Sequence, residues 1–222
     1  MTSNSSFYAD VLYPFQNQVI KAISEADTEF YLTGGTAASR GYLEHRYSDD
    51  LDYFVNDDHR FNLWVERIIQ SLNKSWKCDV LQKEERYARL NLVQKDFSLK
   101  IEMINDVPAR VGEIGNHLLL GRLDSAENIL ANKLTALLAR EEPKDLADVW
   151  GFCCNMNLSL KNAITDAQSK AAGIFPADLA RILLSVQKTD WEAVRWIQAP
   201  PAEAFISQLS QLGENLLLID EE

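Results

Sequence analysis

Residues 31–55 read YLTGGTAASRGYLEHRYSDDLDYFV and carry the clearest pattern in the chain. The stretch opens with a short apolar run that ends at paired glycines, which is typical of a strand leading into a turn. A helix is then expected to begin near Thr36, because threonine suits the N-cap position. Residues 49–55, DDLDYFV, follow as a second strand. The stretch therefore predicts strands and helix mixed in this part of the chain.

Three aspartates gather at the start of that second strand. Ionised carboxylates this close repel one another and are costly to desolvate. Because side chains alternate across a strand, Asp50 and Asp52 share one face while Leu51 and Tyr53 share the other. Two carboxylates spaced in this way can grip one Mg²⁺ or bridge two, with phosphate oxygens and water completing the octahedron. The alternative is a solvent-exposed strand face that binds nothing.

Gly34 and Gly35 stand between the expected strand and the expected helix. Paired glycines let the backbone approach an anion closely, and the free N–H groups of a helix N-terminus favour phosphate. Together with Thr36 they are candidates for binding a nucleotide phosphate. The alternative is a tight strand-to-helix turn, since a motif this short is weak.

Glu102 lies in a later strand candidate, LKIEMIN, residues 99–105. If this strand lies beside the aspartate strand, Glu102 completes a carboxylate triad that binds metal or accepts a proton from a nucleophile. The alternative is a glutamate on a solvated face beside Lys100.

Lys133 lies in an otherwise apolar helical stretch, ILANKLTALLAR, and two aspartates follow on the next helix. Asp145 and Asp148 are three residues apart and share a helix face. Lys133 can hold triphosphate oxygens as a point charge. The alternative is a lysine–aspartate pairing that joins the two helices.

The rest of the chain divides into a strand-rich part and a helical part. Before residue 107 we expect helices over 11–28 and 58–73, strands over 77–84, 87–94 and 97–105, and a hairpin at QKDF, residues 94–97. Residues 107–122 are expected to form a glycine-punctuated connection. Later helices are expected over 124–140, 143–156, 159–172, 176–187, 189–197 and 201–213, with capping boxes at Asp124/Glu127 and Thr189/Glu192. The pattern predicts an α+β fold, with a mixed β-sheet flanked by helices over 1–108 and an all-helical region over 109–222.

Composition narrows the classes of function. The 222 residues carry a formal net charge of −11, which argues against broad electrostatic capture of nucleic acid but leaves RNA binding at a local basic cleft open. No apolar run approaches the roughly 18 residues that span a bilayer, so no membrane partner is expected. The first residues do not predict a secretory signal. The three cysteines show no metal-ligand spacing, and a reduced cytoplasmic setting is expected.

Four ordered motifs together resemble the AbiEii/AbiGii toxin-type nucleotidyltransferases of the DNA polymerase beta-like superfamily. The motifs are Gly-Gly-Thr-Ala at 34–37, Arg-x-Ser-x-Asp-hydrophobic-Asp-hydrophobic-Phe at 46–54, Lys-x-x-Ala-Leu-x-x-Arg at 133–140, and Lys-Asp-hydrophobic-x-Asp at 144–148. The resemblance covers about residues 30–152 and implies a nucleotidyltransferase-type sheet.

The resemblance also implies roles for individual residues. Gly34, Gly35 and Thr36 would bind the NTP phosphates, and Asp50 and Asp52 would hold Mg²⁺, with Mn²⁺ as the alternative metal. Lys133 and one or both of Asp145 and Asp148 would complete the active site, and Arg46 and Ser48 would orient the nucleotide or the metal-binding strand. The third carboxylate is assigned to Glu102 from the strand pattern, with Asp106 as a second candidate.

The activity implied is transfer of a nucleoside monophosphate from an NTP to an acceptor hydroxyl, with pyrophosphate released. The acceptor class is open among RNA such as tRNA, protein and a small molecule, and the chain would be the toxin partner of a cognate antitoxin. One alternative is a non-catalytic module that senses nucleotide or binds a protein. Another is a metal-dependent phosphohydrolase, although the three histidines have no ligand spacing.

Overall fold

A computed structural model describes residues 3–94 and 97–218 of the chain. The chain forms two compact units that alternate along the sequence. The first, here called the sheet unit, comprises Met1–Ala37, Ser48–Pro108 and Glu113–Asp124; the second, here called the helical unit, comprises Ala38–Tyr47, Ala109–Gly112 and Ser125–Glu222. Residues 38–47 thus belong to the helical unit and residues 113–124 to the sheet unit. The division expected from the sequence, between residues 108 and 109, assigns 38–47 to the sheet part and 113–124 to the helical part.

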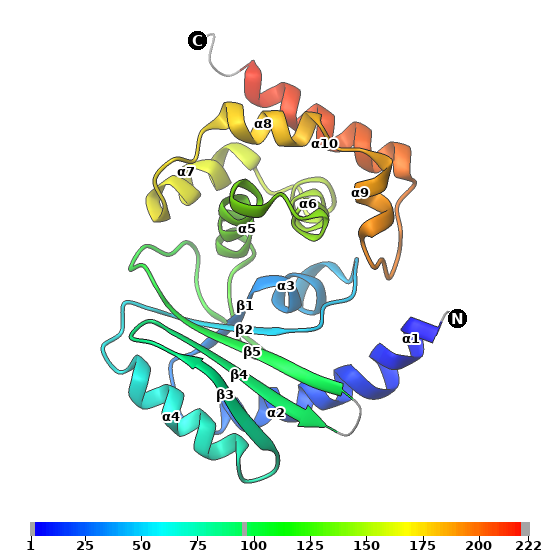
Figure 1. Cartoon of the computed structure of the whole chain (residues 1–222). Coiled ribbons are helices and arrows are strands. Elements are labelled where there is room, and N and C mark those ends of the chain that lie inside the picture. The colour runs from blue at the N-terminus through cyan, green and yellow to red at the C-terminus, as the bar shows by residue number, and fades with distance from the viewer. Residues whose placement is uncertain (1–2, 95–96, 219–222) are drawn as a thin grey trace. The chain divides into compact units, whose positions relative to one another are not determined.

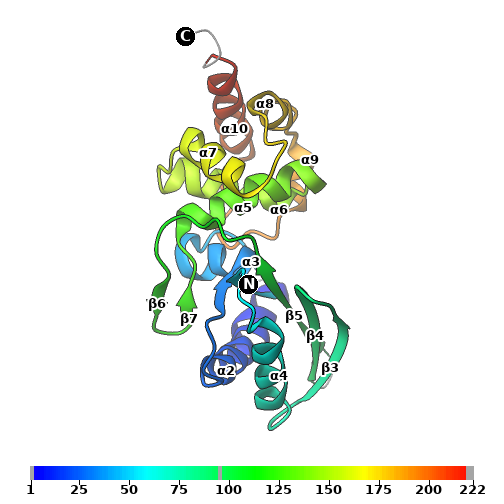
Figure 2. The ribbon, with the colours of Figure 1, turned by 90° about the vertical axis from the view of Figure 1, so that its left-hand side faces the viewer.

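The sheet unit is built on a seven-stranded mixed sheet with the order β3-β4-β5-β2-β1-β7-β6 (Figures 1 and 2). The strands are β1 Tyr31–Thr33, β2 Leu51–Asn56, β3 Lys77–Lys83, β4 Tyr87–Gln94, β5 Phe97–Asp106, β6 Gly115–His117 and β7 Gly121–Leu123. Strand β2 runs antiparallel to β1 and parallel to β5, so the strand that carries the aspartates is central. The predicted α+β class with a mixed sheet is confirmed.

The central strands bury one face and present polar side chains on the other. In β2, Leu51, Tyr53 and Val55 are buried, as alternation predicts. Helices α2, Tyr13–Ser24, and α4, Phe61–Leu72, lie on the same side of this sheet (Figures 1 and 2). The other face carries the polar residues of β2 and β5.

Short helical segments lead into α2 and out of β1. They are α1 Ser3–Phe7 and the π-helical η1 Tyr8–Leu12 before α2, and α3 Gly34–Thr36 and the π-helical η2 Ala37–Leu43 after β1. The helix expected near Thr36 therefore begins two residues earlier, at the first glycine.

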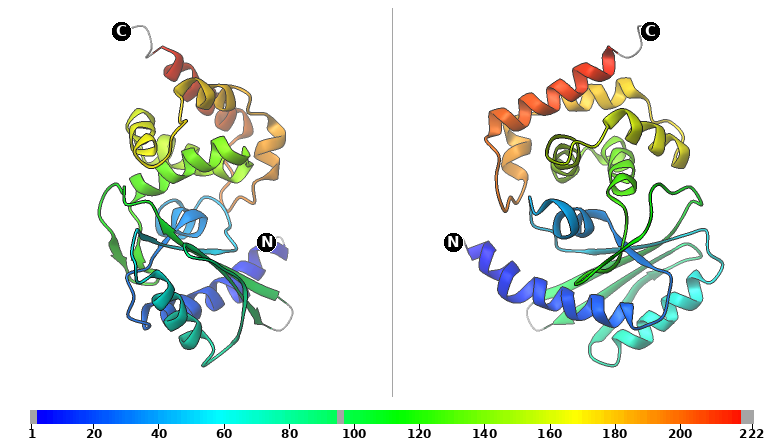
Figure 3. Two further views of the ribbon diagram at one scale, coloured as in Figure 1. Left: turned by 60° about the vertical axis from the view of Figure 1, so that its left-hand side comes forward. Right: turned by 180° about the vertical axis from the view of Figure 1, so that it is seen from behind.

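The helical unit consists of stacked helices around α5. Its later helical segments are α5 Ala126–Arg140, α6 Pro143–Trp150, η3 Gly151–Asn155, α7 Leu160–Lys170, α8 Pro176–Leu184, α9 Lys188–Ala193 and α10 Ala202–Leu217. Helix α5 contacts α6, α7 and α8, and α10 packs along α8 (Figure 3). Over 3–94 and 97–218, no helix is long and apolar enough to cross a membrane.

The connections that follow β5 and that join β4 to β5 can be compared with the sequence-based expectations. The stretch 107–122 is more than a connection, because it contains β6 and most of β7, which pair with each other. The β4–β5 hairpin is present, with Gln94 opposite Phe97. The predicted turn between them, residues 95–96, lies outside the described residues.

The helix caps also differ from the predicted capping boxes. Ser125, not Asp124, caps α5, and its Oγ accepts a hydrogen bond of 3.2 Å from the amide of Asn128. Asp124 instead accepts a 2.7 Å hydrogen bond from the hydroxyl of Thr33. The second capping box is formed by Gln187 and Asp190, two residues earlier than expected.

Candidate functional site

Gly34 brings the backbone against the carboxylate of Asp52. Strand β1 ends at Thr33, and Gly34 opens α3 with φ at +66°, a conformation that favours glycine. A Cβ at this position would lie 2.2 Å from Asp52 Oδ2, so no other residue type fits without moving that carboxylate. The glycine pair is therefore more than a generic turn, because its first member is shaped around a predicted metal ligand.

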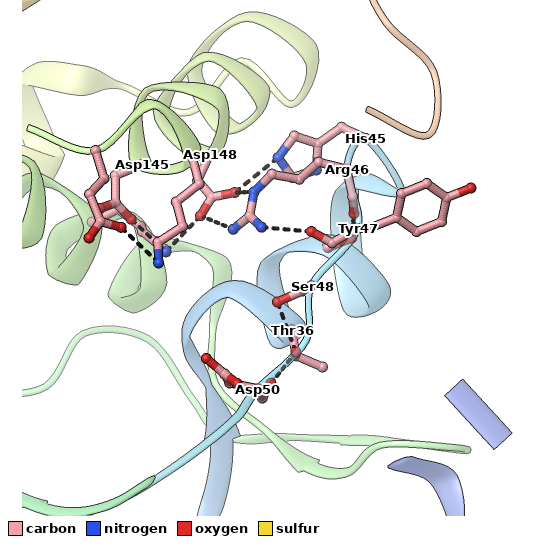
Figure 4. Close-up of polar contacts among 12 residues, drawn as sticks. Thr36, His45, Arg46, Tyr47, Ser48, Asp50, Asp145 and Asp148 are labelled. Atoms are coloured by element: carbon pink, nitrogen blue, oxygen red, sulfur yellow. Dashed lines mark hydrogen bonds and ion pairs between the residues drawn. The ribbon is translucent and has the colours of Figure 1, made fainter. Parts of the chain in front are cut away.

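Thr36 and Ser48 fix the backbone at the start of the aspartate strand. The Thr36 hydroxyl donates to the carbonyl oxygen of Asp50 at 2.5 Å, and it lies 3.0 Å from the Ser48 hydroxyl (Figure 4). Thr36 has no exposed area and Ser48 is buried. In the structure both hydroxyls bind protein groups, so they position the strand.

Residues near the N-terminus hold the same loop from its other side. The Gln16 side chain has no exposed area and donates to the carbonyl oxygens of Ser48, at 3.4 Å, and Asp49, at 2.8 Å. The Tyr8 hydroxyl donates to Asp49 Oδ1 at 2.6 Å, and Tyr13 Oη accepts from the Ser48 amide at 3.3 Å. Hydrogen bonds to its side chain and carbonyl therefore hold Asp49 in place, and this fixes the backbone that leads to Asp50 and Asp52.

Glu102 lies where the strand pattern predicts, but its carboxylate is engaged with basic side chains. It is the register partner of Asp52 on β5. Its Oε1 accepts from Arg89 at 2.8 Å and from the Tyr87 hydroxyl. Burial alone would raise the pKa of Glu102, but these hydrogen bonds and the charge of Lys100 lower it below its usual range.

Lys100 links two of the predicted metal ligands. Its Nζ lies 2.9 Å from Asp50 Oδ2 and 3.3 Å from Glu102 Oε2. Burial lowers the pKa of Lys100, but the two carboxylates outweigh it and raise the pKa, so the lysine is a cation. In the part of the chain that the structure describes, no three carboxylate, histidine or cysteine side chains are grouped to hold a metal ion.

The helical unit contains a buried ion network centred on Asp148 (Figure 4). Both oxygens of this carboxylate accept from Arg46, each at 2.7 Å, and Oδ2 also lies 2.7 Å from Lys133 Nζ. Lys133 Nζ donates to Asp145 at 2.8 Å, and Asp145 accepts from Arg140 Nε at 2.7 Å. The lysine–aspartate pairing weighed as the alternative role is therefore present.

Charge balance keeps this network ionised. Burial by itself would raise the pKa of Asp148, but Arg46 and Lys133 hold it well below its usual range. Burial would lower the pKa of Lys133, and Asp148 and Asp145 raise it instead. The charges of Arg46, Lys133, Asp145 and Asp148 stabilise one another. They also fix the side chain of Arg46, two residues before Ser48.

His45 belongs to the same network, although its sequence context gave no signal for it. Its Nε2 lies 3.0 Å from Asp148 Oδ1, and its Nδ1 is buried and has no hydrogen-bond partner among the described residues. Burial lowers the pKa of His45 below its ordinary value of 6.5 in spite of the neighbouring carboxylate. The histidine is therefore neutral at pH 7 and donates to Asp148.

The predicted residues fall into two groups, one in each unit. Gly34, Thr36, Ser48, Asp50, Asp52 and Glu102 meet in the sheet unit, and Arg46, Lys133, Asp145 and Asp148 meet in the helical unit. The sheet group places carboxylates beside a glycine turn, a combination suited to a metal-bound phosphate.

Two solved structures from Helicobacter pylori share the fold of this chain. A Helicobacter pylori structure described as that of a candidate nucleotidyltransferase aligns with 96% of this chain and 98% of its own, at 19% identity and a TM-score of 0.63. The structure of JHP933 from Helicobacter pylori aligns with 91% of this chain and 90% of its own, at 20% identity and a TM-score of 0.62. At these identities the likeness shows the fold alone.

No curated protein matches the chain. Residues 19–167, in contrast, match the family described as "Nucleotidyl transferase AbiEii toxin, Type IV TA system". That span is more than half of the 222 residues and includes each motif found in the sequence. The chain therefore belongs to the AbiEii nucleotidyltransferase toxin family of type IV toxin–antitoxin systems.

Proposed function

We propose that this chain transfers a nucleoside monophosphate from an NTP to an acceptor hydroxyl, with Asp50 and Asp52 as the ligands of a catalytic Mg²⁺ or Mn²⁺. The observation that carries the proposal is the close approach of Gly34 to Asp52, where a Cβ would lie 2.2 Å from the carboxylate. The approach places a predicted metal ligand against the turn that opens α3, whose backbone amides are proposed to bind phosphate.

The residues present fit a divalent cation. Asp50 is partly exposed, Asp52 is on the same face of β2, and Glu102 neighbours Asp52 in register. Carboxylate oxygens of this kind are the ligands that Mg²⁺ takes, together with phosphate oxygens and water. When bound, the metal would supply charge neutralisation at the triphosphate and at the attacking oxygen.

The chain's own groups would bind and orient the nucleotide. Gly34 and Gly35 open α3, and their backbone amides are proposed to bind the phosphates. Thr36 and Ser48 would act as positioning residues through the backbone of Asp50. Glu102 is proposed as the third carboxylate. It would accept the proton of the attacking hydroxyl or bind the metal.

The network in the helical unit is proposed to position Arg46 and to hold Lys133 as a cation. Lys133 touches both Asp145 and Asp148. A direct contact of Lys133 with the triphosphate remains a prediction of the family resemblance. Asp145 and Asp148 would act through the two basic side chains that they orient.

The acceptor is proposed to be RNA such as tRNA, a protein or a small molecule, and a cognate antitoxin is proposed as the regulatory partner. The family description, a toxin of a type IV system, supports the antitoxin and the NTP. The net charge of −11 requires that any RNA acceptor be bound at a local basic surface.

Transfer is tested with each α-³²P-labelled NTP, Mg²⁺ and cell extract, by following label that becomes attached to a larger acceptor. The wild type should label an acceptor, and Asp50→Asn and Asp52→Asn should each lower the rate at least about 100-fold. Asp58→Asn is the matched control, because its carboxylate pairs with Arg60 on the surface of the same unit. Labelling that survives in Asp52→Asn, or no labelling by the wild type with any NTP, would overturn the proposal.

A further inference from the structure

Lys100 lies next to a carboxylate that the proposed function gives to a metal. Its Nζ is 2.9 Å from Asp50 Oδ2, within the range of a charge-assisted hydrogen bond. The same nitrogen lies 3.3 Å from Glu102 Oε2. Both contacts come from one side chain on β5, the strand that runs parallel to β2.

The arrangement follows from strand pairing. Leu51 is in register with Ile101, so residue 50 and residue 100 are neighbours at the same level of the two strands. Lys100 and Glu102 are two apart on β5 and point to the same face. Lys100 therefore reaches one carboxylate across the strands and one along its own strand.

The electrostatic balance of the cluster is nearly neutral without a metal. Asp50 and Glu102 contact two cations, Lys100 and Arg89, and Asp52 is the register partner of Glu102. The formal charges of these five side chains sum to one negative charge. A free divalent cation would therefore meet little net attraction and would have to compete with an ammonium already bound to Asp50.

A metal–triphosphate complex meets a different balance. The triphosphate brings negative charge that offsets both the metal and the released ammonium. The side chain of Lys100 is 38% exposed and can leave Asp50 while it stays beside Glu102. Release of the lysine is thus less costly when nucleotide arrives with the metal than when the metal arrives alone.

We propose that Lys100 is a resident counter-ion of Asp50 that keeps free divalent cations out and admits the metal together with the triphosphate. This inference rests on the proposed function, in which Asp50 is a metal ligand. Lys100 acts through Asp50 and is a positioning residue. It gives the enzyme an order of addition in which metal and nucleotide bind together.

The test measures metal binding directly, without turnover. Mn²⁺ is titrated into the full-length protein and free Mn²⁺ is followed by electron paramagnetic resonance, first alone and then with an α,β-methylene NTP of each base in turn. Lys100→Met removes the charge and keeps most of the stem, Lys100→Arg keeps the charge, and Asp50→Asn removes the ligand. Lys77→Met is the matched control, because Lys77 pairs with Asp79 on β3 of the same sheet.

Lys100→Met should bind Mn²⁺ alone about tenfold more tightly than the wild type, as expected for one partly solvent-screened charge at a few ångströms. The advantage that the nucleotide analogue gives to Mn²⁺ binding should shrink by a similar factor. Lys100→Arg and Lys77→Met should behave as the wild type, and Asp50→Asn should lose tight binding. Circular dichroism melting checks that each variant is folded.

Two contrary results separate the inference from the function beneath it. If the wild type binds Mn²⁺ with the analogue, and Lys100→Met binds Mn²⁺ alone no more tightly than the wild type, Lys100 is a structural ion pair and the inference is wrong while the function stands. If no form binds Mn²⁺ with or without the analogue, Asp50 is not a metal ligand and both are wrong.

Discussion

Replacement of Asp148 by asparagine tests the buried ion network of the helical unit. The substitution preserves the size of the side chain and removes its charge. Asp148 has no exposed area and accepts from Arg46, Lys133 and His45. In the variant, two buried cations remain where their shared counter-charge has been lost, and the amide group can replace only part of the hydrogen bonding.

The magnitude follows from the contacts. Removing one member of a buried ion pair costs about 3–5 kcal/mol, because the partner charge stays desolvated. We expect Asp148→Asn to lower the free energy of unfolding by about this amount, since Arg46 and Lys133 both lose contacts of 2.7 Å. Asp145→Asn should cost about 1–3 kcal/mol. There Lys133 keeps Asp148, and the Arg140 side chain is 43% exposed and regains water.

Urea unfolding followed by tryptophan fluorescence measures these losses, since Trp150, Trp191 and Trp196 lie in the helical unit. The control Glu192→Gln alters an exposed i,i+4 pair with Lys188 in the helical unit and should cost less than about 1 kcal/mol. If Asp148→Asn costs no more than Glu192→Gln, charge does not hold the network together.

Three further predictions concern the glycine turn, the buried histidine and the N-terminal contact. Gly34→Ala should lower transfer about 100-fold by displacing Asp52, whereas Gly173→Ala, with φ at +83° and no atom within 4 Å of its Cβ, should cost about 1–2 kcal/mol of stability and no activity; equal activities would show that the collision is harmless. Stability should fall as pH drops below 6.5, because the unfolded chain protonates His45 before the folded chain does, and a urea series should find this slope flattened in His45→Gln; an unchanged slope would assign it to other groups. Gln16→Leu should lower the free energy of unfolding by about 1–3 kcal/mol, because the carbonyls of Ser48 and Asp49 lose a buried donor, and it should also reduce kcat, because the loop before the aspartates is no longer held. A fall in stability without a fall in kcat would make the contact purely structural.

Sequence patterns predict which face of its own strand each carboxylate occupies, but not which strands pair. Alternation along residues 97–105 put Glu102 on a polar face, and the pairing of β5 with β2 then brought it beside Asp52. The same alternation put Lys100 on that face, but its bond to Asp50 depends on strand order and register. These are set by packing between segments far apart in the chain, which local patterns do not encode.

The features that sequence patterns do not predict are contacts between residues far apart in the chain and very short strands. His45 meets Asp148 across 103 positions, so no motif spacing could announce the pair. Asp124 has capping-box spacing but bonds Thr33, 91 positions away, and the cap passes to Ser125. Strands β6 and β7 have three residues each, too few for a periodic signal.

The residues expected to carry the chemistry were selected by motif and by residue chemistry together, and their roles stay a prediction. Strand alternation alone predicts that Asp50 and Asp52 share one face. Lys133 was open between phosphate binding and ion pairing, and only the structure reveals its contacts with Asp145 and Asp148. A buried lysine can be identified from its apolar surroundings, but its partner cannot.

The central claim is that Asp50 and Asp52 support metal-dependent transfer of a nucleoside monophosphate. The most direct measurement follows α-³²P and γ-³²P label from the same NTP in parallel reactions with Mg²⁺ and the acceptor fraction. Transfer predicts α-label in the acceptor and an equal amount of γ-label in pyrophosphate, both lost in Asp52→Asn and both kept in Asp58→Asn. Recovery of the α-label as free nucleoside monophosphate, or as intact bound NTP, would contradict the account.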